Sequence, residues 1–385
     1  MTDSLPLTGI RVIELALLLN GPMAASVLGR LGAEVLKLER PGVGDPARSN
    51  EPVNLNKRSV TADVTTPAGR EVLYDLARQS DVFITNLRPD SLKQMGADPA
   101  TLAAVNPRLI YAAGTCYGQH GERANDPGQN TTATAVAGLL HLCRDDDSEP
   151  RDIPGTVSST LSGTMLAMGV VSALLQRERT GEAPPVHCSM IASNMWYQYL
   201  PIARFASTGE EPPMMSSRRS VANAFNNRYV CSDGQWFAFT QATQPDRYWP
   251  IICRALGIEA LEHDARFETA ELRRERRHEL VAILDTVFAT KTAREWEAVF
   301  HEHEIQGTSV NDYAHMIEDP EVVANGFITT TESGNRTVAL PFTLADTHAT
   351  LRPIGALGSD TDAVLAEVCG YTPERIEALR ALGAV

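Results

Sequence analysis

The chain has 385 residues, and its 48 aspartates and glutamates outnumber its 34 lysines and arginines, which gives a formal net charge of −14. A chain this acidic, without any basic run, is not expected to bind nucleic acid or an anionic membrane. Its length and its hydrophobic fraction of 43% are typical of a globular protein with one large and one smaller domain.

Targeting and redox features of the sequence favour the cytoplasm. The stretch MTDSLPLTG lacks the charged and apolar regions of a signal peptide, and no apolar run is long enough to span a membrane. The six cysteines lie far apart and form no CxxC pair, which favours reduced thiols over disulfides or zinc ligands. We therefore expect a cytoplasmic protein without a metal site.

Strands and helices alternate in the first half of the chain. A long apolar helix is predicted over 163–178, and shorter helices are predicted between the strands. Strands separated by helices predict an α/β fold, with a parallel sheet covered by helices on both faces. The predicted strands are GIRVIELA (9–16), EVLKLER (34–40), DVFITN (81–86), PRLIYAAGTCYG (107–118) and APPVHCSM (183–190).

The pattern changes near residue 200. The segment EEPPMMSSRRS (210–220) is polar and contains two prolines, as expected of a linker, and NNRYVCSDGQWFAFTQA (226–242) is typical of a β-hairpin. Helices rich in Glu, Arg and His follow up to about residue 304.

The turn after the first strand, LLLNGPMAA, has a single glycine. It therefore lacks the G-x-G-x-x-G cradle that binds the pyrophosphate of a dinucleotide.

Several long stretches together resemble the class III CoA-transferases, the group named after carnitine dehydratase and the bile-acid-inducible protein (CaiB/BaiF). The resemblance implies a Rossmann-like large domain built from 1–200 and 320–385, a linker at 201–219 and a small domain at 220–315. It also implies that two subunits interlock as a dimer. The matching stretches follow the family order: GIRVIELALLLNGPMAASVLGRLGAEVLKLERPGVGDPAR, NLNKRSVTADVTTPAGREVLYDLA, SDVFITNLRPDSLKQMG, NPRLIYAAGTCYGQHG, GTMLAMGVVSALLQRERTGEA and NNRYVCSDGQWFAF.

The resemblance further implies that coenzyme A binds at the loops after the first strands. Arg40, at the end of EVLKLER, matches a nucleotide-contacting position where a guanidinium would pair with a phosphate. Asp63 and the stretch Asn86-Leu87-Arg88 match two further contacting regions. Without the resemblance, both arginines would be interpreted as solvated residues at strand ends. The implied substrates are an acyl-CoA and a carboxylic acid, with no metal.

The catalytic aspartate of the family is missing from this chain. In the family, the aspartate lies four residues before the glycine that opens the long helix, and its carboxylate attacks the acyl-CoA carbonyl to give a mixed anhydride. Counting back from Gly163 gives Ser159, whose hydroxyl would need a base to act as a nucleophile. Gln129 and Asn130 match the His-Asp of the Gly-His-Asp turn in the racemase branch, and a glutamine cannot exchange protons. These two residues are expected to line the substrate pocket.

Three functions remain open from the sequence. The resemblance predicts an acyl-CoA:carboxylate CoA-transferase family protein that serves as the aspartate-lacking subunit of a heteromeric enzyme, with an aspartate-bearing paralogous subunit as its partner. The second possibility is a non-catalytic acyl-CoA-binding protein. The third is an altered acyl-CoA enzyme, either a thioesterase that uses Ser159 or a racemase-like enzyme. The expected assembly is a homodimer or a heteromer with the aspartate-bearing paralogous subunit. No motif identifies the acyl group or the acceptor acid.

Overall fold

The chain divides into two compact units. The large unit comprises Met1–His141, Asp152–Pro212 and Ala324–Val385, and the small unit comprises Leu142–Arg151 and Pro213–Val323. Part of the predicted linker, 212–217, lies outside the described residues. The structure, a computed structural model, describes residues 5–144, 149–211, 218, 221, 223–241, 243–344 and 349–385.

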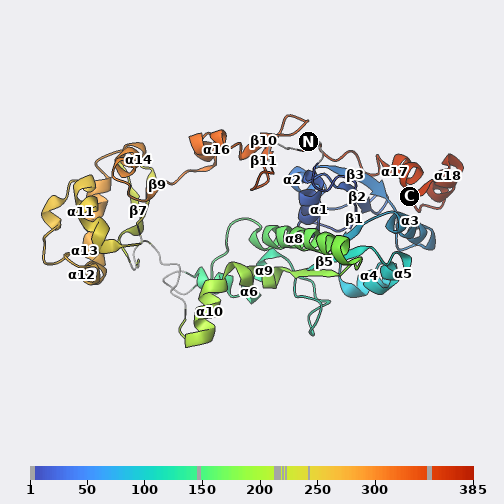
Figure 1. Cartoon of the computed structure of the whole chain (residues 1–385), viewed down its shortest axis with the longest axis horizontal. Coiled ribbons are helices and arrows are strands. Elements are labelled where there is room, and N and C mark those ends of the chain that lie inside the picture. Colours follow the sequence, from blue (N-terminus) through green and yellow to red (C-terminus); the bar gives the residue numbers. More distant parts are fainter. Residues whose placement is uncertain are drawn as a thin grey trace. The chain divides into compact units, whose positions relative to one another are not determined.

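A six-stranded sheet forms the centre of the large unit (Figure 1). Its strands are β1 (Arg11–Leu15), β2 (Glu34–Glu39), β3 (Lys57–Thr61), β4 (Val82–Thr85), β5 (Ile110–Thr115) and β6 (Val186–Ser189). The strand order is β3-β2-β1-β4-β5-β6, and every neighbouring pair is parallel, which confirms the predicted α/β fold. β3 is not predicted from sequence because KRSVT begins with two basic residues, although its Lys57 is buried in an ion pair.

Helices cover both faces of this sheet. The helices of the large unit are α1 (Asn20–Arg30), α2 (Glu51–Asn54), α3 (Pro67–Arg78), α4 (Pro89–Met95), α5 (Pro99–Val105), α6 (Asn130–Val136), α7 (Leu139–Leu142), α8 (Val157–Thr180), α9 (Met190–Tyr197), α10 (Tyr199–Thr208), α17 (Thr361–Cys369) and α18 (Pro373–Ala381), and α16 (Pro320–Ala324) lies mostly in the small unit. Successive strand side chains point to opposite faces. Val12 therefore packs with α1 and α8, and Ile13 packs with α3, α17 and α18.

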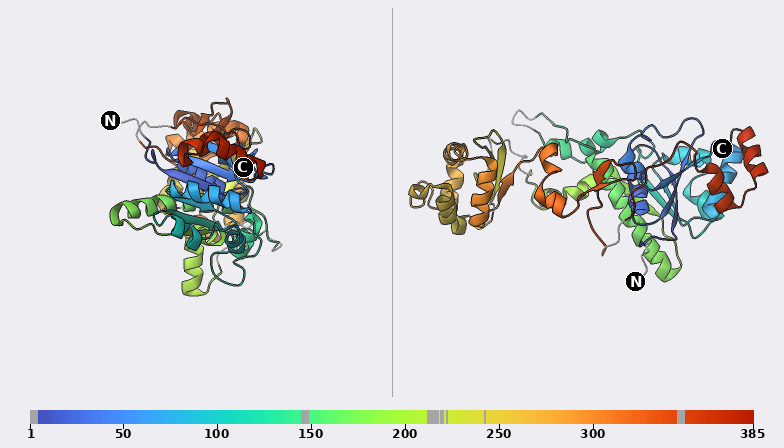
Figure 2. Two further views of the ribbon diagram at one scale, coloured as in Figure 1. Left: turned by 90° about the vertical axis from the view of Figure 1, so that its right-hand side faces the viewer. Right: turned by 90° about the horizontal axis from the view of Figure 1, so that it is seen from above.

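The C-terminal segment returns to the sheet formed by the first hundred residues. In both views of Figure 2, the red helices α17 and α18 lie beside the blue strands. The Asp360 carboxylate accepts a hydrogen bond from the backbone N–H of Ser59 (2.8 Å), and the backbone N–H of Asp63 donates to the carbonyl of Ala384 (2.8 Å). A short antiparallel pair, β10 (Ile328–Thr330) and β11 (Arg336–Val338), precedes these helices.

The long helix α8 begins at Val157, six residues before the predicted start at 163. The side chain of Asn130 caps this end, because its Oδ1 accepts hydrogen bonds from the backbone N–H groups of Ser158 (3.0 Å) and Ser159 (3.4 Å). A cap supplied from 28 residues away leaves no local sequence pattern. Ser159, the position predicted for the family's aspartate, therefore lies in the first turn of α8 and not before the helix.

Helix α8 is a core helix of the large unit. A Cβ atom at Gly163 would lie 2.6 Å from the carbonyl oxygen of Asn20, so glycine at this position lets α1 and α8 approach closely. No apolar run of membrane-spanning length is expected from the sequence, but within the described ranges α8 is the one helix long and apolar enough to cross a membrane. Its buried face packs against α1, β5 and β6.

The small unit is built around a three-stranded antiparallel sheet. The predicted hairpin is confirmed: β7 (Asn226–Val230) pairs with β8 (Trp236–Thr240), and β9 (Gly307–Ser309) adds to β8. Buried aromatic side chains fill the space between this sheet and the helices, with Phe288 stacked on Tyr229 at a ring-centroid distance of 4.7 Å. Its helical elements are α11 (Pro245–Leu256), η1 (Glu259–Leu261), α12 (Ala270–Glu275), α13 (Arg277–Phe288), α14 (Ala293–Glu302) and α15 (Tyr313–Met316).

Candidate functional site

The predicted CoA-contacting residues lie beyond the carboxyl ends of β2, β3 and β4. The strand order reverses between β1 and β4, and open parallel sheets bind ligands in the crevice at such a point. The loop after β1 (16–19) and the start of the loop after β4 meet there. Asn86 joins them, since its Oδ1 accepts from the N–H of Leu17 (2.9 Å) and its Nδ2 donates to the Leu17 carbonyl (2.6 Å).

The other residues of the Asn86-Leu87-Arg88 stretch have different environments. Leu87 is partly buried and packs against the core cluster that contains α3. Arg88 is exposed at the N-terminal end of α4. A cation in this position is open to an anionic ligand, whereas Asn86 is engaged in holding the neighbouring loop.

Arg40 and Asp63, which follow β2 and β3, form an ion pair. Arg40 Nε lies 3.2 Å from Asp63 Oδ2, and the Arg40 side chain is 61% exposed. The Thr65 hydroxyl and backbone N–H donate to the Asp63 carboxylate; together with Arg40 they lower its pKa, although burial opposes the shift. Asp63 therefore stays ionised and orients the guanidinium. Arg40 is the member of the pair that is suited to contact a phosphate.

Ser159 lies in a buried environment without charge. Its side chain is 7% exposed, and its hydroxyl contacts the thioether sulfur of Met190 at 3.6 Å. Among the described residues, no histidine, lysine or carboxylate hydrogen-bonds to this hydroxyl. A serine hydroxyl needs such a base to become a nucleophile. This geometry therefore does not favour the thioesterase interpretation.

Amide side chains surround the start of α8. Asn130 caps the helix, and the Ser158 hydroxyl accepts from Asn194 Nδ2 (2.7 Å) and donates to the Asn130 carbonyl (3.2 Å). Asn130 and Ser159, both predicted as site residues, are thus brought together, whereas Gln129 is exposed. Asn194 is missed from sequence. The available signal is a lone amide in the apolar stretch MIASNMWY, which becomes fully buried.

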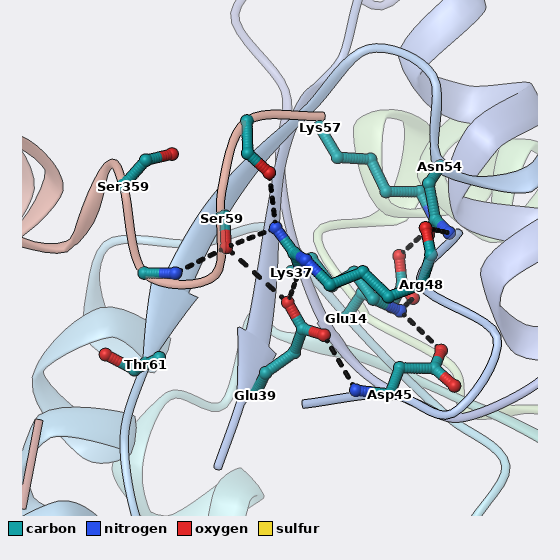
Figure 3. Close-up of polar contacts among 12 residues, drawn as sticks. Glu14, Lys37, Glu39, Asp45, Arg48, Asn54, Lys57, Ser59, Thr61 and Ser359 are labelled. Atoms are coloured by element: carbon teal, nitrogen blue, oxygen red, sulfur yellow. Dashed lines mark hydrogen bonds and ion pairs between the residues drawn. The ribbon is translucent and has the colours of Figure 1, made fainter. Parts of the chain in front are cut away.

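A group of buried charged side chains lies on one face of the sheet, next to the first turn of α1 (Figure 3). Glu14, Lys37 and Lys57 come from the adjacent strands β1, β2 and β3, and their side chains are fully buried. Lys37 Nζ lies 2.7 Å from Glu14 Oε1 and 2.9 Å from Asp45 Oδ2, and Lys57 Nζ lies 2.5 Å from Glu14 Oε2. Two ammonium groups and two carboxylates balance in charge. We call these four residues the buried charge network.

The buried charge network continues to a second ion pair at the end of β2. The backbone N–H of Asp45 donates to Glu39 Oε1 (2.9 Å), and Glu39 pairs with Arg48. Arg48 also donates to the hydroxyl of Ser59 (3.0 Å) and to the carbonyl of Gly355 (2.6 Å). The network therefore connects the strands to the C-terminal segment. The signal that could have revealed it is a single charged residue inside the apolar runs VIEL and VLKL.

Lys57 gives the stability of the large unit a pH dependence. Burial lowers its pKa from 10.5 to about 8, although the charge of Glu14 opposes this shift. Between pH 8 and 10 the Lys57 side chain therefore binds more protons in the unfolded chain than in the folded chain, and its contribution to the free energy of unfolding rises with pH, by at most about 1.4 kcal/mol per unit. Buried thiols such as Cys369, whose pKa burial raises to about 11, act in the opposite direction. Urea unfolding across this range should therefore give a more positive slope against pH in the wild type than in Lys57→Met, which keeps the same thiols. Equal slopes would contradict the assignment.

Within the part of the chain that the structure describes, there is no group of three or more His, Cys, Asp or Glu side chains placed to hold a metal ion. The candidate site consists instead of arginines at the carboxyl edge of the sheet and amides around the start of α8.

Comparison with known proteins identifies the family. The family model for CoA-transferase family III matches residues 7–361. The chain is 29% identical to mouse succinyl-CoA:glutarate CoA-transferase over 404 residues, covering 99% of this chain and 90% of the mouse protein. It is 30% identical to the succinyl-CoA–L-malate CoA-transferase beta subunit of Chloroflexus aurantiacus over 412 residues, covering 98% of each. The crystal structure of a CAIB/BAIF family protein from Brucella suis matches with a TM-score of 0.85 at 27% identity, covering 95% of this chain and all of that one. The resemblance stated from the sequence is confirmed, and the chain belongs to CoA-transferase family III.

Proposed function

We propose that this protein is the aspartate-lacking subunit of a heteromeric, cytoplasmic acyl-CoA:carboxylate CoA-transferase. An aspartate-bearing paralogous subunit supplies the nucleophile, whose carboxylate attacks the thioester carbonyl, forms a mixed anhydride and releases CoA as its thiolate. This chain contributes a CoA-binding site at the carboxyl edge of its large sheet and the surface that binds the partner subunit. The acyl group and the acceptor acid are left unassigned.

The environment of Ser159 carries the proposal. The first turn of α8 holds a serine hydroxyl against a thioether, with Asn130 as the cap of the helix. A neutral hydroxyl without a base cannot replace a carboxylate that must be both a nucleophile and a leaving group. Family membership together with this chemical gap favours a chain that depends on a partner for its chemistry.

Substrate binding is assigned to the carboxyl edge of the large unit. Arg40, oriented by Asp63, and Arg88 would pair with phosphate groups of an acyl-CoA. Asn86 would hold the backbone against which the ligand lies. Local cations of this kind allow an acidic protein to bind an anionic substrate.

Exposed apolar helices support a stable partner subunit. Helix α10 has no buried residue in its ten positions, and an isolated helix of this length is unstable in water. Large side chains on α9 and α10 are exposed: Met195, Trp196, Tyr197, Tyr199, Leu200 and Phe205. Patches of this kind mark protein interfaces. A homodimer or a heteromer with the paralogous subunit would cover them, and an interlocked arrangement is the form that the family resemblance implies.

Reconstitution tests the proposal. The purified chain alone should show no CoA transfer from any of several acyl-CoA donors to dicarboxylate acceptors. Co-expression with an aspartate-bearing paralogue should give turnover, and replacing that aspartate by alanine in the partner should abolish it. Robust transfer by the chain alone would overturn the proposal. Binding of CoA without turnover alongside any paralogue would instead establish a non-catalytic acyl-CoA-binding protein.

Replacing Ser159 by aspartate is expected to restore only slow attack on the acyl-CoA thioester. Ser159→Asp places a carboxylate in the first turn of α8, where the helix N-terminus favours it, but the site is buried and Asn130 presents an oxygen toward it. We expect a folded variant that binds CoA as before and forms an aspartyl adduct slowly, detectable by mass spectrometry. Turnover should stay well below about 1 per second.

Ser159→Ala is the matched control for this substitution. It should form no adduct and should bind CoA like the wild type, since the serine hydroxyl has no charged partner. Loss of a measurable acyl-CoA hydrolysis in the alanine variant would instead establish the thioesterase function. Transfer by Ser159→Asp at ordinary enzymatic rates would show that the pocket retains everything except the acid.

A further inference from the structure

The loop after β1 (16–19) has an unusual backbone. Leu18 adopts a φ of +63°, a conformation that residues with a Cβ rarely occupy and that costs free energy. Its side chain is 44% exposed and that of Leu17 is 38% exposed, so burial of these leucines does not hold the loop in place. Other contacts must maintain the conformation.

Polar groups below and beside the loop provide these contacts. Asp45 Oδ1 accepts hydrogen bonds from the backbone N–H groups of Leu18 (3.0 Å) and Ala47 (2.9 Å). Lys57 Nζ donates to the carbonyl of Pro22, in the first turn of α1 (2.9 Å). Asn86 holds Leu17 from the side of β4, as described above. The backbone is therefore held at Leu17 by Asn86 and at Leu18 by Asp45, and the helix that follows the loop is held at Pro22 by Lys57.

Asp45 can hold the loop because the buried charge network fixes it in turn. Its second oxygen, Oδ2, lies 2.9 Å from Lys37 Nζ, and Lys37 is paired with Glu14 at 2.7 Å. Asp45 itself is only 5% exposed and so is not placed to contact a ligand broadly. A series of contacts thus runs from Glu14 on β1, through Lys37 and Asp45, to the backbone amide of Leu18.

We propose that Asp45 and Lys37 are positioning residues. They hold the backbone of the loop after β1 in the conformation that binds coenzyme A at the carboxyl edge of the sheet. This role rests on the proposed function of that edge as a CoA-binding site. The network acts through the backbone of Leu18 and not by direct contact with the ligand. A carboxylate this close to a phosphate-binding edge is tolerated because Lys37 neutralises it.

Asp45→Asn tests the role with little change in shape. The carboxylate accepts from Leu18 on one oxygen and faces the Lys37 ammonium with the other. An asparagine has one oxygen and one NH₂ group, so whichever way its amide turns, one of these two donors loses its acceptor. The remaining oxygen should turn to the Lys37 ammonium, because hydrogen bonds to a charged group are the stronger ones. The NH₂ group then faces the Leu18 and Ala47 amides, and the loop is released.

Asp81→Asn is a matched control at the opposite edge of the same sheet. Asp81 Oδ2 accepts from the backbone N–H of Arg11 (2.9 Å), and Oδ1 pairs with Arg177 at 2.8 Å, so an asparagine faces the same conflict there. Its side chain is 28% exposed, and it lies at the start of β4, away from the CoA-contacting loops. Both variants should lower the free energy of unfolding, but only Asp45→Asn changes a contact of the loop at the proposed CoA-binding edge.

Calorimetry with free coenzyme A and hydrogen exchange of the segment 15–22 give the two measurements. We expect Asp45→Asn to weaken binding about tenfold and to speed exchange at Leu18 at least about tenfold. Asp81→Asn should leave both within about twofold of the wild type. An equal loss of affinity in the two variants, or unchanged exchange in Asp45→Asn, would overturn the positioning role. If the wild type binds no coenzyme A, the proposed function fails, and the exchange comparison alone decides whether Asp45 holds the loop.

Discussion

Replacing Lys37 by methionine is expected to lower the free energy of unfolding of the large unit by about 3–5 kcal/mol. The ammonium group is fully buried and pairs with both Glu14 and Asp45. Methionine keeps much of the side chain's length without the charge. Glu14 would keep its ion pair with Lys57, and the buried carboxylate of Asp45 would lose its cationic partner. An uncompensated buried charge is among the most destabilising changes a point substitution makes.

Urea unfolding at fixed protein concentration, followed by circular dichroism, measures this loss. Arg380→Met is the matched control, because it removes a cation from an exposed ion pair with Asp362 and Glu377, and it should cost less than about 1 kcal/mol. Adding Asp45→Asn to Lys37→Met should regain part of the loss, since it removes the orphaned charge. A cost below about 1 kcal/mol for Lys37→Met would show that packing alone holds these strands together.

Deleting residues 354–385 is expected to prevent the large unit from folding. Val364 and Leu365 are fully buried and Ile376 and Leu379 are nearly so, all in the core cluster that contains α3. Burying four such side chains contributes about 6–12 kcal/mol. This is comparable to the whole stability of a typical domain, about 5–15 kcal/mol. The deletion also removes Asp360, the hydrogen-bond acceptor for the N–H of Ser59 on the edge strand β3.

Circular dichroism and the yield of soluble protein test the deletion, and two point substitutions calibrate it. Leu365→Ala, at a fully buried position, should cost about 2–5 kcal/mol. Leu382→Ala, at a side chain that is 71% exposed, should stay within about 0.5 kcal/mol of the wild type. A shortened chain that unfolds cooperatively and binds coenzyme A would show that the C-terminal segment is an accessory to the fold.

The parallel sheet could be predicted from sequence because its buried strands are apolar runs, as in VFIT of β4. β3 could not, since the groups that make Lys57 compatible with burial are Glu14 on β1, two strands away in the sheet, and the Pro22 carbonyl in α1. The sequence predicts the start of α8 six residues too late, at 163 instead of Val157, for a related reason. Its cap is the side chain of Asn130, and nothing between Asp152 and Gly163 indicates that contact.

The candidate site also contains residues that the sequence predicts and residues that it does not. Arg40, Asp63 and Asn86 were predicted through the family resemblance, and the structure adds that Asp63 orients Arg40 and that Asn86 holds the loop after β1. Asp45 was not predicted, because in sequence it is one acidic residue in the loop GVGDPAR. Its importance comes from two groups that only the fold brings to it, the Leu18 amide and the Lys37 ammonium.

The return of the C-terminal helices to the first sheet has a consequence during synthesis on the ribosome. The last strand of the sheet ends at Ser189, yet α17 begins only at Thr361. At about 5–20 residues per second, the roughly 170 residues in between take roughly 10–35 s to translate. Through that interval the nascent sheet exposes the face that α17 and α18 later cover. We expect this protein to depend on chaperones that bind apolar surface while the small unit is still being made.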